Sequence, residues 1–188
     1  MRKLVVFNQV TLDGYFAGVG GDIGWAHKHE NDEEWNTFVA NNASTGGVLL
    51  FGRKTYELMA SYWPTPQALK NDPLVAEHMN GLPKVVFSRT LDKASWSNTT
   101  LVKGDLTQEV RRLKQEAGDD MAILGSGSIV SQLAQAGLID EYQIAVNPVV
   151  LGKGRTLFEG IKDPLALKLT NTRTFGNGNV FLSYEPMA

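Results

Sequence analysis

The sequence predicts an α/β fold of three layers (αβα), in which helices cover both faces of a mainly parallel sheet and an antiparallel hairpin ends the chain. Short apolar segments alternate with helical patterns from residue 3 to residue 150, as is typical of parallel sheets. Two further strand-like runs, at 165–175 and 179–185, surround the turn sequence GNGN and indicate the hairpin. Neither a linker nor an internal repeat interrupts this pattern, so we expect one domain over residues 1–188.

The expected strands before the hairpin are short and mostly apolar, as strands buried on both faces are. They span residues 3–7, 46–51, 84–88, 101–102, 121–124 and 140–150. The expected helices span residues 31–42, 53–63, 107–117 and 129–136. Their ends carry residues that begin or stop helices: Asn31 or Asp32 as the first N-cap, Pro64 after the second helix and Gly137 after the last. Residues 12–25 are expected to form a glycine-rich loop, and residues 65–80 a loop with one short helix.

Composition argues against several classes of protein. The formal net charge is −2, which disfavours a general nucleic-acid binder. The chain has no cysteine, so disulfides, thiolate nucleophiles and zinc–thiolate sites are excluded. The three histidines, His27, His29 and His78, form no H-E-x-x-H pattern, and we expect no catalytic metal. Neither a signal-like start nor an apolar run of roughly 18 residues is present, so we expect a cytoplasmic protein without a membrane segment.

Three segments that leave expected strands carry residues suited to binding phosphate. Residues 125–128 (GSGS) open a helix, which places free backbone N–H groups and the positive end of a helix dipole at one point. Residues 51–55 (FGRKT) and 88–90 (SRT) add cationic and hydroxyl side chains, and arginine offers a fork to a 2′-phosphate. Because the carboxyl ends of parallel strands share one edge of the sheet, we expect the three segments to surround one ligand. Taken alone, residues 125–128 are equally explained as a plain strand-to-helix turn, and Val130 replaces the third glycine of the dinucleotide fingerprint. Taken alone, Arg53 is explained as a solvated residue at a helix start and Arg89 as a loop residue.

Five segments occur in an informative order along the chain: TLDGYFAG (11–18), LLFGRKTYE (49–57), KVVFSRT (84–90), ILGSGSIVSQL (123–133) and LIDEYQIAVNPVVLGKGRTLF (138–158). In this order they resemble the dihydrofolate reductase-like family, in the branch of the reductase domain at the C-terminus of the riboflavin-biosynthesis protein RibD and its stand-alone relatives. The resemblance covers nearly the whole chain. It implies an eight-stranded, mainly parallel sheet, an NADPH site and reduction of a pteridine-like or pyrimidine-like ring.

The resemblance also implies which residues hold the cofactor. It places Gln9, Val10 and Phe16 beside the nicotinamide; Gly52, Arg53, Lys54 and Thr55 at the phosphates; Ser88, Arg89 and Thr90 near the adenosine phosphate; and Gly125, Ser126, Gly127, Ser128 and Ile129 at the pyrophosphate turn. Relatives carry Gly-Gly at this turn, sometimes with a cis peptide. This chain has Gly125–Ser126 instead, and whether that peptide is cis or trans is left open.

Dihydrofolate reductases place a carboxylate on the helix that follows a tryptophan. Here Trp25 is followed by Glu30, Asp32, Glu33 and Glu34, and Asp32 is the acid that we expect to face the ligand. Asp13 in the LDG turn is the rival. The alternatives are that the helix acids only interact with the helix dipole and that Asp13 only forms a turn.

The sequence therefore predicts an NADPH-dependent oxidoreductase that transfers a hydride to a small heterocyclic substrate of the pteridine, pyrimidine or flavin type. A non-catalytic nucleotide- or flavin-binding module on the same fold is the alternative. We also expect a homodimer in which residues 144–150 and the terminal hairpin pair between subunits. An ordinary central strand with protected edges is the alternative for these segments.

Overall fold

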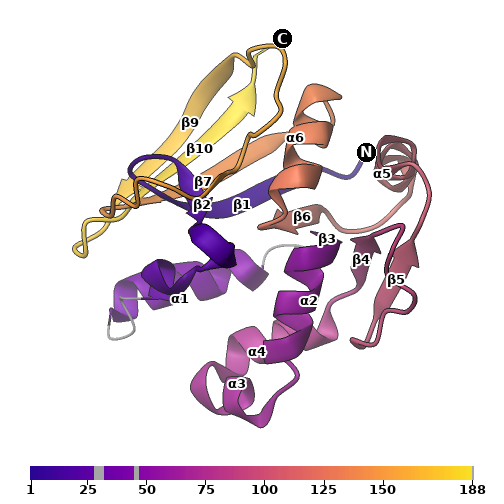
Figure 1. The fold of residues 1–188 in the computed structure, drawn as a ribbon, viewed down its shortest axis with the longest axis horizontal. Coiled ribbons are helices and arrows are strands. Elements are labelled where there is room, and N and C mark those ends of the chain that lie inside the picture. The colour runs from indigo at the N-terminus through magenta and orange to yellow at the C-terminus, as the bar shows by residue number, and fades with distance from the viewer. Residues whose placement is uncertain (28–31, 45–46, 188) are drawn as a thin grey trace.

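An eight-stranded sheet lies at the centre of the computed structural model, which describes residues 1–27, 32–44 and 47–187 (Figure 1). Its strands are β1 (Leu4–Thr11), β3 (Val48–Gly52), β4 (Lys84–Phe87), β5 (Thr99–Val102), β6 (Met121–Leu124), β7 (Glu141–Asn147), β9 (Leu167–Thr174) and β10 (Val180–Pro186). They are arranged in the order β5-β4-β3-β6-β1-β7-β10-β9. All neighbours from β5 to β7 pair in parallel, whereas β10 pairs antiparallel with both β7 and β9.

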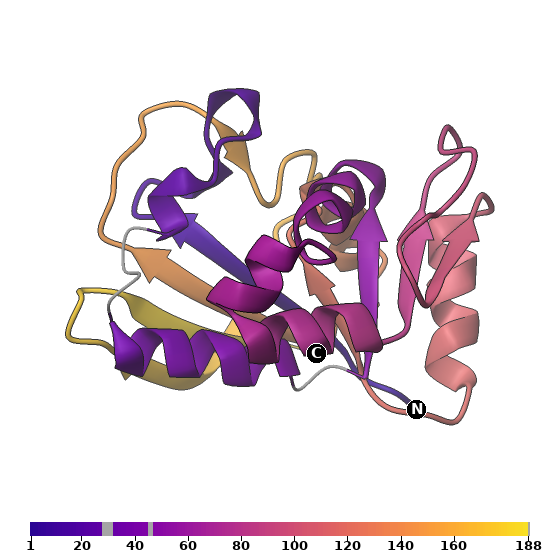
Figure 2. The same cartoon turned by 90° about the horizontal axis from the view of Figure 1, so that it is seen from below.

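Helices cover both faces of this sheet. The helices are α1 (Glu33–Ser44), α2 (Arg53–Tyr62), α3 (Pro66–Asn71), α4 (Pro73–Gly81), α5 (Leu106–Gln115) and α6 (Gly127–Gln135). In Figures 1 and 2 the first four lie on one side of the sheet, and α5 and α6 lie on the other. The predicted three-layer α/β fold with a terminal antiparallel hairpin is confirmed.

Three apolar clusters hold the layers together, and they lie on opposite faces of the sheet because side chains along β1 alternate between the two faces. Val6 points with Ile123 and Val130 into the cluster beneath α5 and α6, whereas Phe7 packs on the opposite face. There it joins Trp35 and Phe181 in the cluster beneath α1, while a further cluster lies beneath α2 and α4. Because successive side chains of a strand point to opposite faces, a strand buried on both faces must be apolar throughout.

The segment expected to be a glycine-rich loop contains regular structure. Within residues 12–25 lies a short strand, β2 (Tyr15–Ala17), followed by two 3₁₀ turns. It pairs antiparallel with β8 (Arg155–Thr156), far along the chain. Strands of two and three residues are too short to show an alternating pattern, so hydrophobic periodicity does not predict this small sheet.

Two boundaries depend on prolines. Residues 65–80 form α3 and α4 rather than one short helix, because Pro66 and Pro73 each begin a helix, where the missing N–H is no loss. The strand expected at 140–150 ends at Asn147, before Pro148.

Strand β7 does not lie at an edge of the sheet. It pairs with β1 on one side and with β10 on the other, so residues 141–147 lie inside the sheet. Of the two segments expected to pair between subunits, only the hairpin, through its edge strand β9, is therefore free to do so.

Candidate functional site

A cavity of about 720 Å³ lies at the carboxyl ends of β3, β4 and β6. It is lined by Phe16, Gly52, Arg53, Lys54, Thr55, Glu57, Phe87, Ser88, Arg89, Thr90, Gly104, Asp105, Leu106, Ser126, Gly127, Ser128, Ile129, Gln132 and Arg155. All three segments that the sequence singled out for phosphate meet here. They do so because neighbouring parallel strands end at the same edge of the sheet.

The inner end of the cavity is the turn from β6 into α6. Gly125 and Ser126 both have left-handed backbone angles, with φ of 61° and 60°. The Ser126 N–H donates to Thr55 Oγ1 at 3.0 Å, and the Gly52 N–H donates to Ser126 Oγ at 3.0 Å. No peptide bond of the described residues is cis, so Gly125–Ser126 is trans. The two hydrogen bonds of Ser126, to Thr55 and to Gly52, fix the start of α6 against the start of α2.

Both helices direct their positive ends at the cavity. Neither α2 nor α6 has a side-chain N-cap hydrogen bond. The N–H groups of Gly127 and Ser128 donate to no other described residue. Unpaired N–H groups at a helix start are suited to an anion. Gly127 also lets the Phe16 ring pack against the start of α6, since a Cβ there would lie 2.9 Å from Phe16 Cε1.

The outer end of the cavity is made of side chains. Arg53 donates from Nε to Glu57 Oε1 at 2.8 Å and from Nη1 to Thr90 Oγ1 at 2.7 Å. Ser88 Oγ accepts from the N–H groups of Thr90 and Leu91 and thereby shapes the 88–90 turn. The cationic residues that line the cavity are Arg53, Lys54, Arg89 and Arg155. The outer end therefore combines a positioned guanidinium with hydroxyls and further positive charge.

Two carboxylates also line the cavity, Glu57 and Asp105. Asp105 is the N-cap of α5 and accepts from the Gln108 N–H at 2.9 Å and from the Thr107 hydroxyl at 2.7 Å. These bonds, with a smaller contribution from Arg89, hold the pKa of Asp105 below its ordinary value. Asp105 is thus ionised at neutral pH and committed to its helix.

Arg155 is the main lining residue that sequence reasoning missed. Its strand β8 pairs with β2, which places its guanidinium carbon 5.3 Å from the centre of the Phe16 ring. The sequence GKGR held a usable signal, because Gly154 packs against the backbone of Ala17 where a side chain would collide. A glycine next to a cation can mark a backbone that closely approaches another segment.

Some expected cofactor residues do not line the cavity. Gln9 Oε1 accepts from Asn147 Nδ2 at 3.3 Å, and Val10 is buried in β1. Gly125 lies behind Thr55, and its carbonyl accepts from Asn8 Nδ2 at 3.2 Å. The remaining expected positions, including Lys54, Ser128 and Ile129, do line it.

The expected catalytic acids make structural hydrogen bonds. Asp13 accepts from Thr11 Oγ1 at 2.6 Å and from the N–H groups of Leu151 and Gly152, which lowers its pKa, the Thr11 bond contributing most. Asp13 therefore ties the loop before β2 to the loop before β8. Asp32 Oδ1 accepts from the Trp35 N–H at 2.9 Å, as the predicted N-cap does. Asn31, Glu30 and His29 lie outside the described residues.

Trp25 differs from the two acids. Its side chain is 4% exposed, and its Nε1 has no hydrogen-bond partner among the described residues. A buried indole N–H normally has a partner. Trp25 is therefore the expected catalytic residue that keeps an unused donor.

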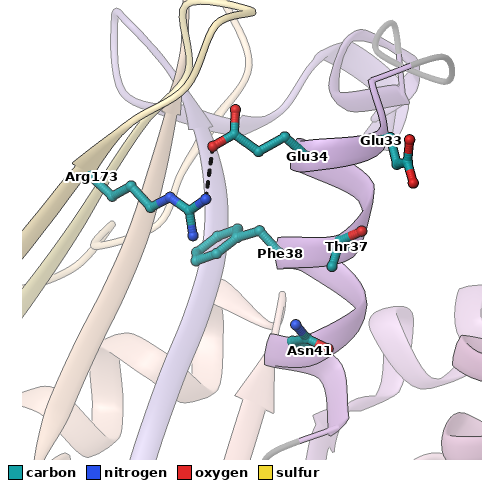
Figure 3. Close-up of a pocket in the computed structure, with 6 residues that line it drawn as sticks. All are labelled: Glu33, Glu34, Thr37, Phe38, Asn41 and Arg173. Carbon is teal, nitrogen blue, oxygen red and sulfur yellow. Dashed lines mark hydrogen bonds and ion pairs between the residues drawn. The ribbon is translucent and has the colours of Figure 1, made fainter.

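A second hollow of about 400 Å³ lies between α1 and β9 (Figure 3). Arg173 reaches from β9 over Phe38 to Glu34, and Nη2 lies 2.7 Å from Glu34 Oε1. Glu33 and Thr37 lie on the side of α1 that is turned away from Arg173. Glu34 is therefore paired with Arg173 of the terminal hairpin.

Across residues 1–27, 32–44 and 47–187, no group of three or more His, Asp or Glu side chains is arranged to hold a metal. No helix in this part of the chain is long and apolar enough to cross a membrane.

Comparison with known proteins identifies the family. Residues 2–181 match the family described as the RibD C-terminal domain. The chain belongs to this family. The Bacillus subtilis (strain 168) uncharacterized protein YyaP is 31% identical over 184 residues, covering 98% of this chain and 95% of its own.

Solved structures share the fold. A putative riboflavin biosynthesis protein from Shewanella sp. PV-4 has a TM-score of 0.79 at 23% identity, with 99% of each chain covered. A Thermotoga maritima deaminase/reductase, described as a diaminohydroxyphosphoribosylaminopyrimidine deaminase and 5-amino-6-(5-phosphoribosylamino)uracil reductase, has a TM-score of 0.70 at 16% identity. The match covers 99% of this chain and 57% of that one. Enterococcus faecalis dihydrofolate reductase, complexed with NADP(H), has a TM-score of 0.66 at 14% identity, over 99% and 97% of the chains. The expected family and fold are confirmed, and the fold is of a reductase type.

Proposed function

We propose that this protein is an NADPH-dependent reductase of a small heterocyclic substrate of the pteridine, pyrimidine or flavin type. One observation carries the proposal: a single cavity of about 720 Å³ gathers two helix starts without side-chain caps and four cationic side chains. Membership of the RibD C-terminal domain family supports it, as does the likeness to a dihydrofolate reductase that binds NADP(H).

The cavity offers two anion subsites of different kinds. In our proposal the N–H groups of Gly127 and Ser128, with Arg155 nearby, hold the pyrophosphate at the inner end. Arg53 and Thr90 hold the 2′-phosphate at the outer end, since Glu57 and Thr90 fix the guanidinium and leave Nη2 for a ligand. NADPH supplies the hydride when it is bound, and the chain binds and orients it.

On the acceptor side we propose Asp32 rather than Asp13 as the acid. Both oxygens of Asp13 accept backbone hydrogen bonds, whereas Asp32 uses Oδ1 and keeps Oδ2 without a partner among the described residues. Asp32 and Trp25 are not among the residues that line the 720 Å³ cavity, and Trp25 Nε1 is buried. In our proposal the acceptor therefore binds beside the cofactor cavity, and Trp25 packs near it without a hydrogen bond to the substrate.

The test begins with thermal unfolding of the purified protein in NADPH, NADH, FMN or buffer alone. We expect NADPH to raise the melting temperature, because a ligand that binds only the folded state stabilises it by mass action. Oxidation of NADPH is then followed with pterins, pyrimidines and flavins as acceptors. Arg53→Ala is expected to weaken NADPH more than NADH. Arg112→Ala is the matched control, because Arg112 also pairs with glutamates of its own helix but does not line the cavity.

Each other outcome has a definite meaning. No stabilisation by NADPH contradicts the proposal. Stabilisation by NADPH without turnover of any acceptor favours a non-catalytic nucleotide-binding module. Stabilisation by FMN alone would assign the cavity to a flavin instead.

A further inference from the structure

Glu57 is an unexpected residue in a cavity for phosphates. It lies one helical turn after Arg53 on α2, and Arg53 Nε is 2.8 Å from Glu57 Oε1. Both residues line the cavity, and both side chains are 45% exposed, so a ligand can reach either. A carboxylate beside a bound 2′-phosphate repels it and offsets part of the charge of Arg53.

The geometry of the pair gives Glu57 two opposing effects. Glu57 holds the Nε edge of the guanidinium while Thr90 Oγ1 accepts from Nη1, so the orientation of the fork is fixed. A fixed fork binds with less loss of side-chain freedom. The negative charge of Glu57 meanwhile weakens the attraction of that fork for a dianion.

Glu57 also supplies what a ribose without a 2′-phosphate needs. Its Oε2 accepts no hydrogen bond from the described residues, and Oε1 is directed at Arg53. In dinucleotide sites of the Rossmann type a carboxylate accepts from the 2′-hydroxyl of NAD, whereas an arginine accommodates the 2′-phosphate of NADP. The Arg53–Glu57 pair offers both groups within one subsite.

We propose that Glu57 sets the cofactor preference of this protein, lowering its selectivity for NADPH and allowing NADH to bind at the same subsite. This inference rests on the proposed function, because it concerns the cofactor site of that reductase. It assigns a specificity-determining role to a residue that pattern reasoning about phosphate would overlook.

The test compares dissociation constants of NADPH and NADH for wild type and Glu57→Gln, by titration of the full chain. Glutamine keeps an oxygen that can accept from Arg53 Nε, so the fork keeps its orientation while the charge is removed. We expect the preference for NADPH over NADH to rise about three- to fivefold, a modest change because solvent screens a half-exposed charge. NADPH is expected to bind more tightly and NADH more weakly.

Glu116→Gln is the matched control, because Glu116 pairs with Arg112 at the same i,i+4 spacing but does not line the cavity. It is expected to leave the preference unchanged. An unchanged or lower preference in Glu57→Gln overturns the inference while leaving the reductase proposal intact. Wild type that binds neither cofactor overturns both.

Discussion

The inner end of the cavity presents backbone groups, whereas the outer end presents side chains. At the inner end, backbone groups face the cavity, and Ser126 is 5% exposed and bonded to both Gly52 and Thr55. At the outer end, Arg53 is half exposed and held by two other side chains. Strand ends fix the positions of backbone groups, whereas side chains adapt and can be exchanged.

This difference suggests a division of labour within the proposed function. The inner end suits the pyrophosphate that NADPH and NADH share, and the outer end suits the 2′ position at which they differ. Changes at the inner end should therefore affect both cofactors together, and some should also affect folding. Changes at the outer end should alter selectivity and leave the free energy of unfolding nearly unchanged.

Gly127→Val should have the largest effect. The new Cβ would lie 2.9 Å from Phe16 Cε1 and 3.4 Å from the Leu157 carbonyl oxygen, and the branched side chain would cover the start of α6. We expect stabilisation by NADPH and by NADH to be lost, with a cost of about 1–3 kcal/mol in the free energy of unfolding from overpacking. Thermal unfolding with each cofactor measures the first effect and urea denaturation the second.

Gly137→Ala is the control for this change. Gly137 ends the same helix with φ of 64° and has open space around it, so alanine strains the backbone without touching the cavity. It should lower stability and leave cofactor binding intact. Cofactor binding that survives in Gly127→Val would mean that the start of α6 holds no phosphate.

Arg155→Ala should weaken both cofactors equally, by about 10- to 100-fold, as expected for loss of a hydrogen bond from a charged donor. The reason is that Arg155 lies over the ring of Phe16, the same ring that a Cβ at Gly127 would contact, and makes no hydrogen bond to Arg53 or Thr90. Dissociation constants from titration give the comparison, with Arg53→Ala as the selective counterpart. A loss confined to NADPH would mean that Arg155 contacts the 2′-phosphate, and it would contradict the assignment of the inner end to the shared pyrophosphate.

The sequence predicted the cavity better than it predicted the groups beside it. The segments at 51–55, 88–90 and 125–128 could be assembled without a structure, because parallel strands end at a common edge. Arg155 carried only an indirect signal, the glycine that precedes it, because its place depends on the pairing of β8 with β2, and strands that short carry no alternating pattern.

The acids show a second reason why prediction stops. Asp32 is one of the two residues expected as N-cap and is also the expected ligand-facing acid, and its bond to the Trp35 N–H confirms the first role. Aspartate suits either role for the same reason, namely that its oxygens accept hydrogen bonds. Residue type and spacing cannot separate the two, whereas the three-dimensional partners of each oxygen can.

Ser126→Ala tests how much the folding of the inner end depends on one hydroxyl. Ser126 Oγ accepts from the Gly52 N–H and donates to the Leu124 carbonyl at 3.3 Å. Its removal leaves a buried N–H without an acceptor, and we expect a loss of about 1–3 kcal/mol in the free energy of unfolding. Both cofactors should weaken in parallel.

Ser126→Gly separates the hydroxyl from the backbone. Glycine loses the same hydrogen bonds but adopts the left-handed conformation of this position, φ 60°, without strain. It should therefore be the more stable of the two variants by up to about 1 kcal/mol. Urea denaturation of both variants gives the comparison, and equal stabilities would show that the turn relaxes out of this conformation.

The smallest effect is expected from Asp13→Asn, which tests whether a carboxylate charge holds the strand that carries Arg155. The Thr11 hydroxyl first, and then the N–H groups of Gly152 and Leu151, lower the pKa of Asp13 in the folded protein. A group with a lowered folded-state pKa stabilises the fold above its unfolded-state pKa, and this contribution is lost as the pH falls through the folded-state value. The free energy of unfolding of wild type should therefore exceed that of Asp13→Asn at pH 7, and the difference should shrink as the pH approaches 3. Asp92→Asn, at an exposed site without a side-chain hydrogen bond among the described residues, is the matched control for the loss of one carboxylate. Urea denaturation at pH 7, 5 and 3 decides the matter, since a constant gap would mean that the charge of Asp13 does not hold the two loops together.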